Sequence, residues 1–303
     1  MIAIDWGTSS FRGYRLDADG RVLERREAPL GILAVEGGRF AEALDTQVGD
    51  WIRARPAAVV MSGMIGSRQG WREAPYARTP AGADEIAAAL VEVSVENGTR
   101  AWIVPGVMTC SADGVHDVMR GEETQILGAL PALGPGHHTL CLPGTHSKWV
   151  VVVDGRIDSF TTHMTGEMFA VLTRHSILGR TMPEGAPEDA EAFAHGLARA
   201  DADGGLLHHL FGVRAQMLAG VLPEAGSRDF LSGLLIGHEC RSVAPRGVVH
   251  LLGAPALAGR YRLALQRMGC TVHLLETDAV TRGLWHVAKA RGLVLPSHGE
   301  PTR

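Results

Sequence analysis

The first thirty residues alternate short apolar runs with turn-forming segments. Apolar runs occupy residues 2–6, 11–16 and 21–28, and residues 7–10 and 17–20 between them are rich in Gly, Ser and Asp. Runs of this length bounded by such residues are typical of β-strands joined by tight turns. The pattern therefore predicts a three-strand meander at the start of the chain.

The apolar spacing then changes to three and four residues, which predicts a helix with one buried face. The residues on that face are Phe40, Leu44, Val48, Trp51 and Ile52. After it the pattern predicts a strand at 57–61, a glycine-rich loop at 62–66, a helix at about 84–95, a strand at 101–107 and a helix from about 121.

A cluster of breaking residues suggests a domain boundary near residue 134. Pro131, Gly134, Pro135 and Gly136 interrupt the helical pattern there. Residues 139–160 then align with the start of the chain, so that Gly144-Thr145 corresponds to Gly7-Thr8. A repeated opening segment suggests a duplicated fold. We expect domains at 1–133 and 134–303.

The second half shows the same alternation of strand and helix patterns. Helical stretches are predicted near 166–180, 188–220 and 226–242, followed by a strand at 248–254, a helix with Leu257, Tyr261, Leu265 and Met268 on one face, a strand at 271–276 and a last helix from about 278. The expected fold is α/β, with two similar domains and a ligand-binding cleft between them.

Composition narrows the class of protein. The chain has 303 residues, 46% hydrophobic and 20% charged, with a net charge of -4 and no basic run, which argues against nucleic acid or an anionic membrane as partner. No apolar run approaches about 18 residues, and no signal peptide precedes the first strand. The four cysteines lie far apart, as expected of buried free thiols. We expect a cytoplasmic protein that acts on small molecules.

The segment Asp5, Gly7, Thr8, Ser9 and Ser10 is a candidate phosphate-binding turn. Glycine allows backbone N–H groups to approach a phosphate, the hydroxyls add donors, and the carboxylate at the strand end can hold hydrated Mg²⁺. The same residue types are also common in ordinary turns. By itself this segment is weakly specific.

A second such turn follows the repeat, at Gly144, Thr145, Ser147 and Lys148. Here the sequence resembles the actin-like superfamily of sugar kinases and ATPases, in which two hairpins bind the phosphates of ATP. The resemblance implies two ribonuclease-H-like domains and makes these four residues candidate ATP ligands. Pro143 stands where the superfamily usually has an acidic residue, which leaves Asp5 as the candidate metal and catalytic carboxylate.

Glu122 and Glu123 lie at the start of the predicted helix from about 121. Acidic residues are common there because they interact favourably with the helix dipole. One of them could instead be the general base that accepts a proton from the attacking hydroxyl. By resemblance to exopolyphosphatases, which have a catalytic glutamate at the corresponding helix start, Glu122 is the first choice and Glu123 the second.

Several strings together resemble the 2-dehydro-3-deoxygalactonokinase family over nearly the whole chain. They are IAIDWG, SGMIGSRQGW with APY after it, VMRGEETQ, LPGTHSKWV, MTGE, FLSGLLIGHE and LLGAPALAGRY. The resemblance implies a kinase of galactonate catabolism that uses ATP and Mg²⁺ to phosphorylate the 6-hydroxyl of 2-dehydro-3-deoxy-D-galactonate. Gly253, Ala254 and Pro255 resemble the adenosine motif of the actin-like superfamily. A strand-to-helix turn also favours glycine for local reasons, but the family resemblance favours contact with the adenosine.

The substrate of such an enzyme is a keto acid, so its site should offer cations or backbone donors. The candidate cations are Arg12, Arg68 and Arg120, with Lys148 able to contact either the substrate or the phosphates. Trp71 and Tyr76 could pack on the sugar acid, although aromatic residues more often lie in a core.

Two other function classes share part of this pattern. An exopolyphosphatase-like hydrolase would use the same hairpins and glutamate without a sugar acid, but would favour a basic channel. A chaperone-like nucleotide switch would want a further region for its partner. The sequence leaves open the oligomeric state, a homo-oligomer included, and the range of keto acids accepted.

Overall fold

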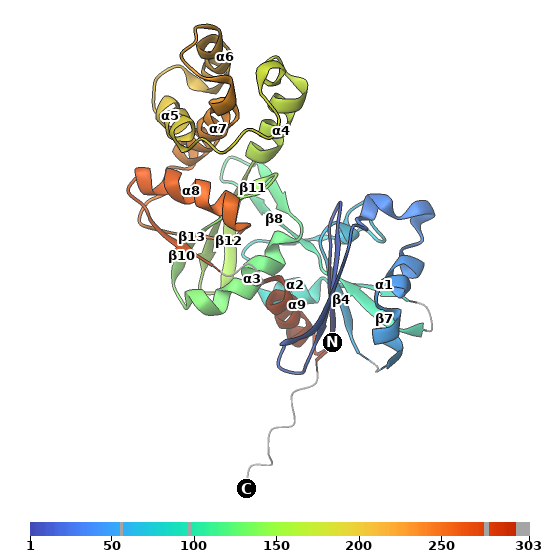
Figure 1. The fold of residues 1–303 in the computed structure, drawn as a ribbon. Coiled ribbons are helices and arrows are strands. Elements are labelled where there is room, and N and C mark those ends of the chain that lie inside the picture. Colours follow the sequence, from blue (N-terminus) through green and yellow to red (C-terminus); the bar gives the residue numbers. More distant parts are fainter. Residues whose placement is uncertain (55–56, 96–97, 276–278, 295–303) are drawn as a thin grey trace. The chain divides into compact units, whose positions relative to one another are not determined.

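A computed structural model describes residues 1–54, 57–95, 98–275 and 279–294 (Figure 1). Contacts within the chain divide it into two compact units. Unit 1 comprises Met1–His137, Val151–Phe160 and Glu276–Arg303, and unit 2 comprises His138–Val150 and Thr161–Leu275. The first change of unit thus falls after residue 137, and the C-terminal segment returns to unit 1. The predicted domain boundary between residues 133 and 134 stays a prediction.

Unit 1 is built on a six-stranded mixed sheet in the order β3-β2-β1-β4-β7-β6. Its strands are β1 (Ile2–Trp6), β2 (Phe11–Leu16), β3 (Val22–Ala28), β4 (Val59–Ser62), β6 (Val91–Ser94) and β7 (Arg100–Ile103). The first three pair as antiparallel neighbours, while β4 runs parallel to both β1 and β7. The predicted N-terminal meander is confirmed.

The core of unit 1 forms where the predicted amphipathic helix covers this sheet. That helix is α1 (Phe40–Ala54), and Phe40, Leu44 and Val48 are buried in one cluster with Trp6 and Phe11. The rings of Trp6 and Phe11 meet edge to face at 5.0 Å. The indole N–H of Trp6 donates to the Leu30 carbonyl oxygen, so the polar end of this buried ring is satisfied.

Two segments of unit 1 differ from the sequence prediction. The helix expected at 84–95 is α2 (Ala83–Ala88) followed by strand β6, in which Val91 and Val93 alternate with polar residues in the period of two that marks a strand. The strand expected at 101–107 is two strands, β7 and β8, because Pro105 separates them and has no N–H to donate to a sheet.

Unit 1 also contains a smaller sheet and two helices that pack against each other. A three-stranded sheet, β5-β8-β9, contains β5 (Tyr76–Arg78), β8 (Gly106–Cys110) and β9 (His116–Met119). Helix α3 (Glu122–Leu133) packs against the C-terminal helix α9 (Ala279–Ala290), and the glycines Gly128 and Gly283 allow the close approach. Residue 278, where the last helix was expected to begin, lies outside the described residues.

The second sheet has the order β12-β11-β10-β13-β14. Its strands are β10 (His137–Leu142), β11 (Ser147–Val153), β12 (Arg156–His163), β13 (Val248–Leu251) and β14 (Thr271–Leu274). The two sheets share a strand order, because β3-β2-β1-β4 in the first corresponds to β12-β11-β10-β13 in the second. In both, the last of these four strands runs parallel to its neighbour, β4 to β1 and β13 to β10. The predicted α/β fold of two ribonuclease-H-like sheets is therefore confirmed.

Unit 2 adds five helices to this sheet, labelled in Figure 1: α4 (Thr165–His175), α5 (Ala190–Ala200), α6 (Gly205–Leu218), α7 (Ser227–Val243) and α8 (Pro255–Arg267). Helices α5 and α7 pack closely because Gly196 and Gly233 leave room for the facing backbone. The helical stretch expected at 188–220 is interrupted between α5 and α6, where Gly204 adopts a φ of 125°.

Short 3₁₀ helices join several of these elements: η1 (Ile32–Ala34), η2 (Glu36–Gly38), η3 (Met64–Gly66), η5 (Leu178–Thr181) and η6 (Glu224–Gly226). Three of the four cysteines are buried as free thiols, as the sequence suggested, whereas Cys110 at the end of β8 is exposed. In the described part of the chain no helix is long and apolar enough to span a membrane.

Candidate functional site

Asp5 lies near the end of β1, opposite Arg12 of β2 in the register of the sheet. Its side chain is 21% exposed, and Arg12 Nη1 donates to Asp5 Oδ2 at 3.2 Å. Burial raises the pKa of Asp5, and the guanidinium of Arg12 partly offsets that rise. A carboxylate that keeps some exposure beside a single cation is able to accept a further cationic ligand.

The turn that follows β1 is held by backbone hydrogen bonds. The Gly7 N–H donates to the Ser10 carbonyl oxygen at 2.9 Å, and the Ile32 N–H donates to the Gly7 carbonyl oxygen at 3.0 Å. A Cβ on Gly31 would lie 2.0 Å from the Thr8 carbonyl oxygen, so the chain packs tightly behind the turn. Thr8 is exposed, as is Ser9 beside it.

The start of α3 lies against the end of β4, close to Asp5. A Cβ on Gly121 would meet the Gly63 Cα at 3.4 Å, and a Cβ on Gly63 would lie 3.4 Å from Asp5 Oδ1. Both glycines have positive φ, 110° for Gly121 and 91° for Gly63. Side chains at either position would be strained and would separate these segments. The segment that precedes the candidate base and the strand end that bears the candidate metal ligand therefore both lie against Gly63 in unit 1.

The two glutamates at this helix start differ sharply in environment. Glu123 has no exposed surface, its Oε2 accepts the Gly121 N–H at 2.6 Å, and its Oε1 is buried without a hydrogen-bond partner. Burial, with a smaller effect of Glu122, raises the pKa of Glu123 to about 8. Glu122 is only half-buried, and its Oε2 accepts the Arg120 N–H at 3.1 Å. Of the two, only Glu122 is open to a ligand.

Of the side chains expected to contact substrate, Arg68, Trp71 and Tyr76 follow β4, Arg12 lies on β2, and Arg120 lies between β9 and α3. Arg120 donates to the Ala74 carbonyl oxygen at 2.8 Å and stacks over the ring of Tyr76 at 4.5 Å. Its Nε and Nη1 are buried without hydrogen-bond partners. Arg68 is highly exposed and pairs with a neighbouring glutamate, while Trp71 stacks on a core phenylalanine. The Arg120 and Trp71 side chains therefore hold the loop in place.

The second turn, after β10, is enclosed by two other segments of unit 2. A Cβ on Gly166 would lie 2.4 Å from the Gly144 carbonyl oxygen, and the Glu167 N–H donates to the Thr145 carbonyl oxygen at 2.9 Å. On the other side, a Cβ on Gly253 would lie 3.3 Å from the Pro143 carbonyl oxygen. The turn is thus packed between the start of α4 and the segment before α8.

Ser147 and Lys148 point into unit 2, away from the exposed surface of this turn. Ser147 is fully buried, and its hydroxyl lies 2.7 Å from the Tyr261 hydroxyl. Lys148 is 5% exposed and donates from Nζ to the Thr162 hydroxyl at 2.7 Å. Thr145 is exposed, so it is the hydroxyl of this turn that can meet a ligand.

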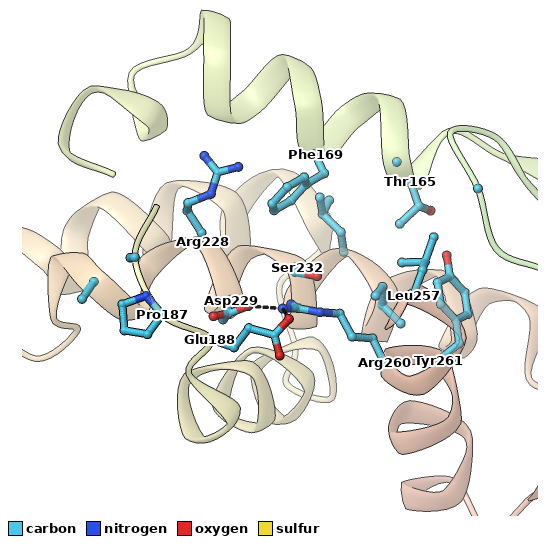
Figure 2. Close-up of a pocket in the computed structure, with 16 residues that line it drawn as sticks. Thr165, Phe169, Pro187, Glu188, Arg228, Asp229, Ser232, Leu257, Arg260 and Tyr261 are labelled. Atoms are coloured by element: carbon cyan, nitrogen blue, oxygen red, sulfur yellow. Dashed lines mark ion pairs between the residues drawn. The ribbon is translucent and has the colours of Figure 1, made fainter. Parts of the chain in front are cut away.

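A cavity of about 330 Å³ opens beside the same turn, within unit 2 (Figure 2). Gly144 and Gly166 line one end, and side chains of α4, α7 and α8 form the walls. Figure 2 shows Arg260 reaching between Asp229 and Glu188, with N–O distances of 2.5 Å and 3.6 Å. This combination of apolar walls and a few fixed polar groups is typical of a small-molecule site.

The sequence interpretation placed Leu257 and Tyr261 on one helix face but did not single out the polar side chains that α7 contributes to this cavity. Asp229 and Ser232 are polar residues on α7, a helix whose polar and apolar positions do not separate into two faces. The signal that could have identified Asp229 is a charged residue at a buried position of a helix. The sequence alone does not show that this position is buried, because the burial depends on where α4 and α8 pack. Arg260 did lie inside one of the strings quoted above.

Comparison with known proteins shows the family. The family described as 2-keto-3-deoxy-galactonokinase matches residues 5–287. The chain belongs to this family. It is 40% identical over 294 residues to the 2-dehydro-3-deoxygalactonokinase of Escherichia coli (strain K12), covering 95% of this chain and 97% of that protein.

Two further comparisons agree. The chain is 40% identical over 298 residues to a probable 2-dehydro-3-deoxygalactonokinase of Rhizobium meliloti (strain 1021), covering 95% of this chain and 96% of that protein. A crystal structure of a putative 2-dehydro-3-deoxygalactonokinase from Sinorhizobium meliloti superposes with a TM-score of 0.87 at 38% identity, covering 95% of this chain and 98% of that one. The resemblance and the fold inferred from sequence are both confirmed.

Proposed function

We propose that this chain is an ATP-dependent kinase that phosphorylates the 6-hydroxyl of 2-dehydro-3-deoxy-D-galactonate, giving 2-dehydro-3-deoxy-6-phospho-D-galactonate. The observation that supports it most strongly is 40% identity, over 95% of the chain, to a protein with this activity in its name. The family match over residues 5–287 includes both candidate phosphate turns and the glutamate pair.

In unit 1, Glu122 is the proposed general base. It would accept the proton of the attacking hydroxyl, a role that requires a carboxylate within hydrogen-bond reach of the substrate. Partial exposure and the fixed hydrogen bond from the Arg120 N–H favour Glu122 over Glu123. Glu123 is better suited to a positioning role, because its fully buried carboxyl holds the Gly121 N–H at the turn that precedes the helix.

Asp5 is the carboxylate proposed to hold the hydrated Mg²⁺ ion. Mg²⁺ that arrives with ATP typically keeps most of its water and uses one or two carboxylates of the protein. Asp5 fits such a single-carboxylate role, since the described residues contain no cluster of three metal-binding side chains. When bound there, Mg²⁺ would neutralise charge on the phosphates, and Gly7, Thr8, Ser9 and Ser10 would provide hydrogen-bond donors.

Unit 2 is the proposed nucleotide-binding part. Gly144 and Thr145 would face the phosphates, and the cavity beside them is large enough for a nucleoside. The segment of Gly253, Ala254 and Pro255 would border the adenosine, because Gly253 packs directly on the residue before this turn. Ser147 and Lys148 would support the turn from inside.

The keto acid would need a cation for its carboxylate. Arg12 is half-exposed and lies beside Asp5, which makes it the first candidate, and Arg68 is the most exposed alternative. Trp71 would shape the loop because its ring stacks on the core, and Arg120 would hold the loop through its bond to the Ala74 carbonyl oxygen while its Nε and Nη1 remain as donors for the acid. The Tyr76 ring, stacked under Arg120, is partly exposed and could face the acid.

The proposal is tested by measuring ADP release from MgATP in a coupled assay. The acceptors are 2-dehydro-3-deoxy-D-galactonate, its gluconate epimer, ordinary hexoses and none. We expect ADP with the galactonate acid and only a trace without acceptor. Equal turnover with and without acceptor would replace the kinase proposal with the exopolyphosphatase-like alternative.

A further inference from the structure

A single buried carboxylate accepts hydrogen bonds from three different elements of unit 2. Glu239 of α7 is 4% exposed. Its Oε1 accepts the indole N–H of Trp149, on β11, at 2.8 Å. Its Oε2 accepts the Tyr261 hydroxyl, on α8, at 2.6 Å and also the hydroxyl of Thr165, the first residue of α4. No lysine, arginine or histidine pairs with this carboxylate in the described residues.

A buried carboxylate is costly unless hydrogen bonds satisfy it. Here one indole and two hydroxyls do so, and a hydrogen bond to a charged acceptor is stronger than one between neutral groups. The pKa of Tyr261 is raised well above its usual value, first by burial and then by the charge of Glu239, so the phenol stays protonated and donates. The geometry of all three donors is therefore fixed by Glu239.

Each hydroxyl donor leads directly to the turn formed by residues 144–147. Tyr261 donates its only hydroxyl hydrogen to Glu239, so at the 2.7 Å contact Ser147 must be the donor and Tyr261 the acceptor. Ser147 is the residue at which the turn enters β11. The last residues of the turn are thereby tied to Glu239 through one intervening ring.

The other side of the turn is tied through α4. Thr165 donates to Glu239, and the next two residues contact the turn itself: Gly166 lies against the Gly144 backbone, and the Glu167 N–H donates to the Thr145 carbonyl oxygen. Thr165 and Tyr261 also line the cavity beside the turn. The same carboxylate thus fixes the turn on both sides and two residues of the cavity wall.

We infer that Glu239 is a positioning residue for nucleotide binding, holding the Gly144–Thr145 turn and the adjacent cavity wall in the geometry that accepts the phosphates and base of a nucleoside triphosphate. This inference rests on the proposed function only in taking that turn and cavity as the nucleotide site. It assigns no contact between Glu239 and the nucleotide, because Glu239 is buried and does not line the cavity.

Two nearly isosteric variants test it in the full-length chain. Glu239→Gln replaces one acceptor oxygen by an amide that cannot accept, and Tyr261→Phe removes the hydroxyl that joins Ser147 to Glu239. The matched controls lie in unit 1: Glu24→Gln, because Glu24 likewise accepts a tryptophan indole N–H, from Trp51 at 2.8 Å, and Tyr14→Phe, because Tyr14 is likewise buried.

The measurement is MgADP binding by titration calorimetry, together with the KM for each substrate. We expect Glu239→Gln to weaken MgADP binding about 10-fold or more and Tyr261→Phe several-fold, at unchanged stoichiometry, with the KM for the acid within about twofold of wild type. Ser147→Ala added to Tyr261→Phe should have little further effect, because both changes break the same chain of hydrogen bonds. Both controls should bind MgADP as wild type does.

The outcomes separate this inference from the proposed function. Wild-type MgADP affinity in both Glu239→Gln and Tyr261→Phe would overturn it, as would equal losses in the two control variants. If Glu239→Gln does not fold, Tyr261→Phe decides alone, since it removes one oxygen atom and keeps the ring. If MgADP binding weakens as expected but no keto acid is phosphorylated by wild type, the inference stands and the proposed substrate is wrong.

Discussion

At the scale of single residues, the pair Glu122 and Glu123 shows how adjacent carboxyl groups acquire different chemistry. Helical geometry turns successive side chains by about 100°, so the second points into unit 1 while the first stays at its surface. Burial raises the pKa of Glu123 to about 8, whereas Glu122 remains open to a ligand. The candidate base and a positioning carboxyl group are therefore neighbours in the chain.

Replacing the proposed base should reduce the rate of chemistry and leave nucleotide binding unchanged. We expect Glu122→Gln to lower kcat by roughly 100-fold or more, in the range typical of a lost general base, while MgADP binding changes less than about twofold. Steady-state kinetics and calorimetry check this. Glu42→Gln, on the exposed face of α1, is the control and should match wild type. A Glu122→Gln enzyme with wild-type kcat would exclude this residue as the base.

The buried carboxyl of Glu123 should make folding stability depend on pH. Its pKa is raised on folding, so between the usual pKa near 4.5 and about 8 the native state binds more protons than the unfolded state. The stability it contributes is present at low pH and is lost as pH rises through that range. Relative to Glu123→Gln, wild type should lose up to about 1.4 kcal/mol per pH unit.

Urea unfolding of both proteins at intervals from pH 5 to pH 9 measures this difference. The curves should diverge up to about pH 8 and run parallel above it. A constant difference across the whole range would show that Glu123 is ionised in the native state at neutral pH.

At the scale of elements, glycines decide how closely α4 approaches the second turn. Gly166, in the first turn of α4, is one such position, because a Cβ there would lie 2.4 Å from the Gly144 carbonyl oxygen. The three nearest atoms are all backbone atoms of Gly144 and Thr145, so there is no flexible side chain to move aside. By contrast, a Cβ on Gly259 of α8 would meet nothing within 4 Å.

This contrast gives a prediction with an internal control. Gly166→Ala should destabilise the protein by about 1 to 3 kcal/mol, the usual cost of overpacking, and should raise the KM for ATP by displacing the turn. Gly259→Ala should stabilise it by about 0.5 to 1 kcal/mol, because alanine favours the helix. Thermal unfolding and steady-state kinetics measure both effects. Similar stability for the two variants would contradict the packing described for α4.

At the scale of the whole molecule, the last described helix is part of the same unit as the first strands. Helix α9 packs on α3 within unit 1, and a Cβ on Gly283 would lie 1.8 Å from the Thr124 carbonyl oxygen. Thr124 follows the two glutamates directly. The last helix of the chain therefore supports the helix that begins with the candidate base.

Disturbing this contact should affect unit 1 selectively. We expect Gly283→Ala to cost about 1 to 3 kcal/mol by overpacking and to speed amide hydrogen exchange in α3 and α9, while exchange in α5 and α7 of unit 2 stays as in wild type. Hydrogen exchange followed by mass spectrometry resolves the two units. Faster exchange in both to the same degree would show that they unfold as one cooperative body.

The sequence by itself determined the local elements and the chemistry of the turns. The short apolar runs at residues 2–6 and 11–16, the helical spacing from Phe40 to Ile52, and the glycine-bearing turn at residues 7–10 each follow from interactions between residues near in the chain. The repeat of this pattern at 139–160 was sufficient to predict two similar sheets, and the sheet orders confirmed it.

Only the tertiary structure decided which of these residues are accessible. Lys148 follows a candidate phosphate turn in sequence yet is buried. Glu239 lies in one of the quoted strings, but no local pattern marks it as the acceptor of hydrogen bonds from one strand and two helices. The return of α9 to unit 1 likewise has no local signal. Burial and hydrogen-bond partners depend on segments that are distant in the chain, such as Ser147 and Tyr261, which are 114 residues apart. Short-range patterns contain no information about which distant segments meet.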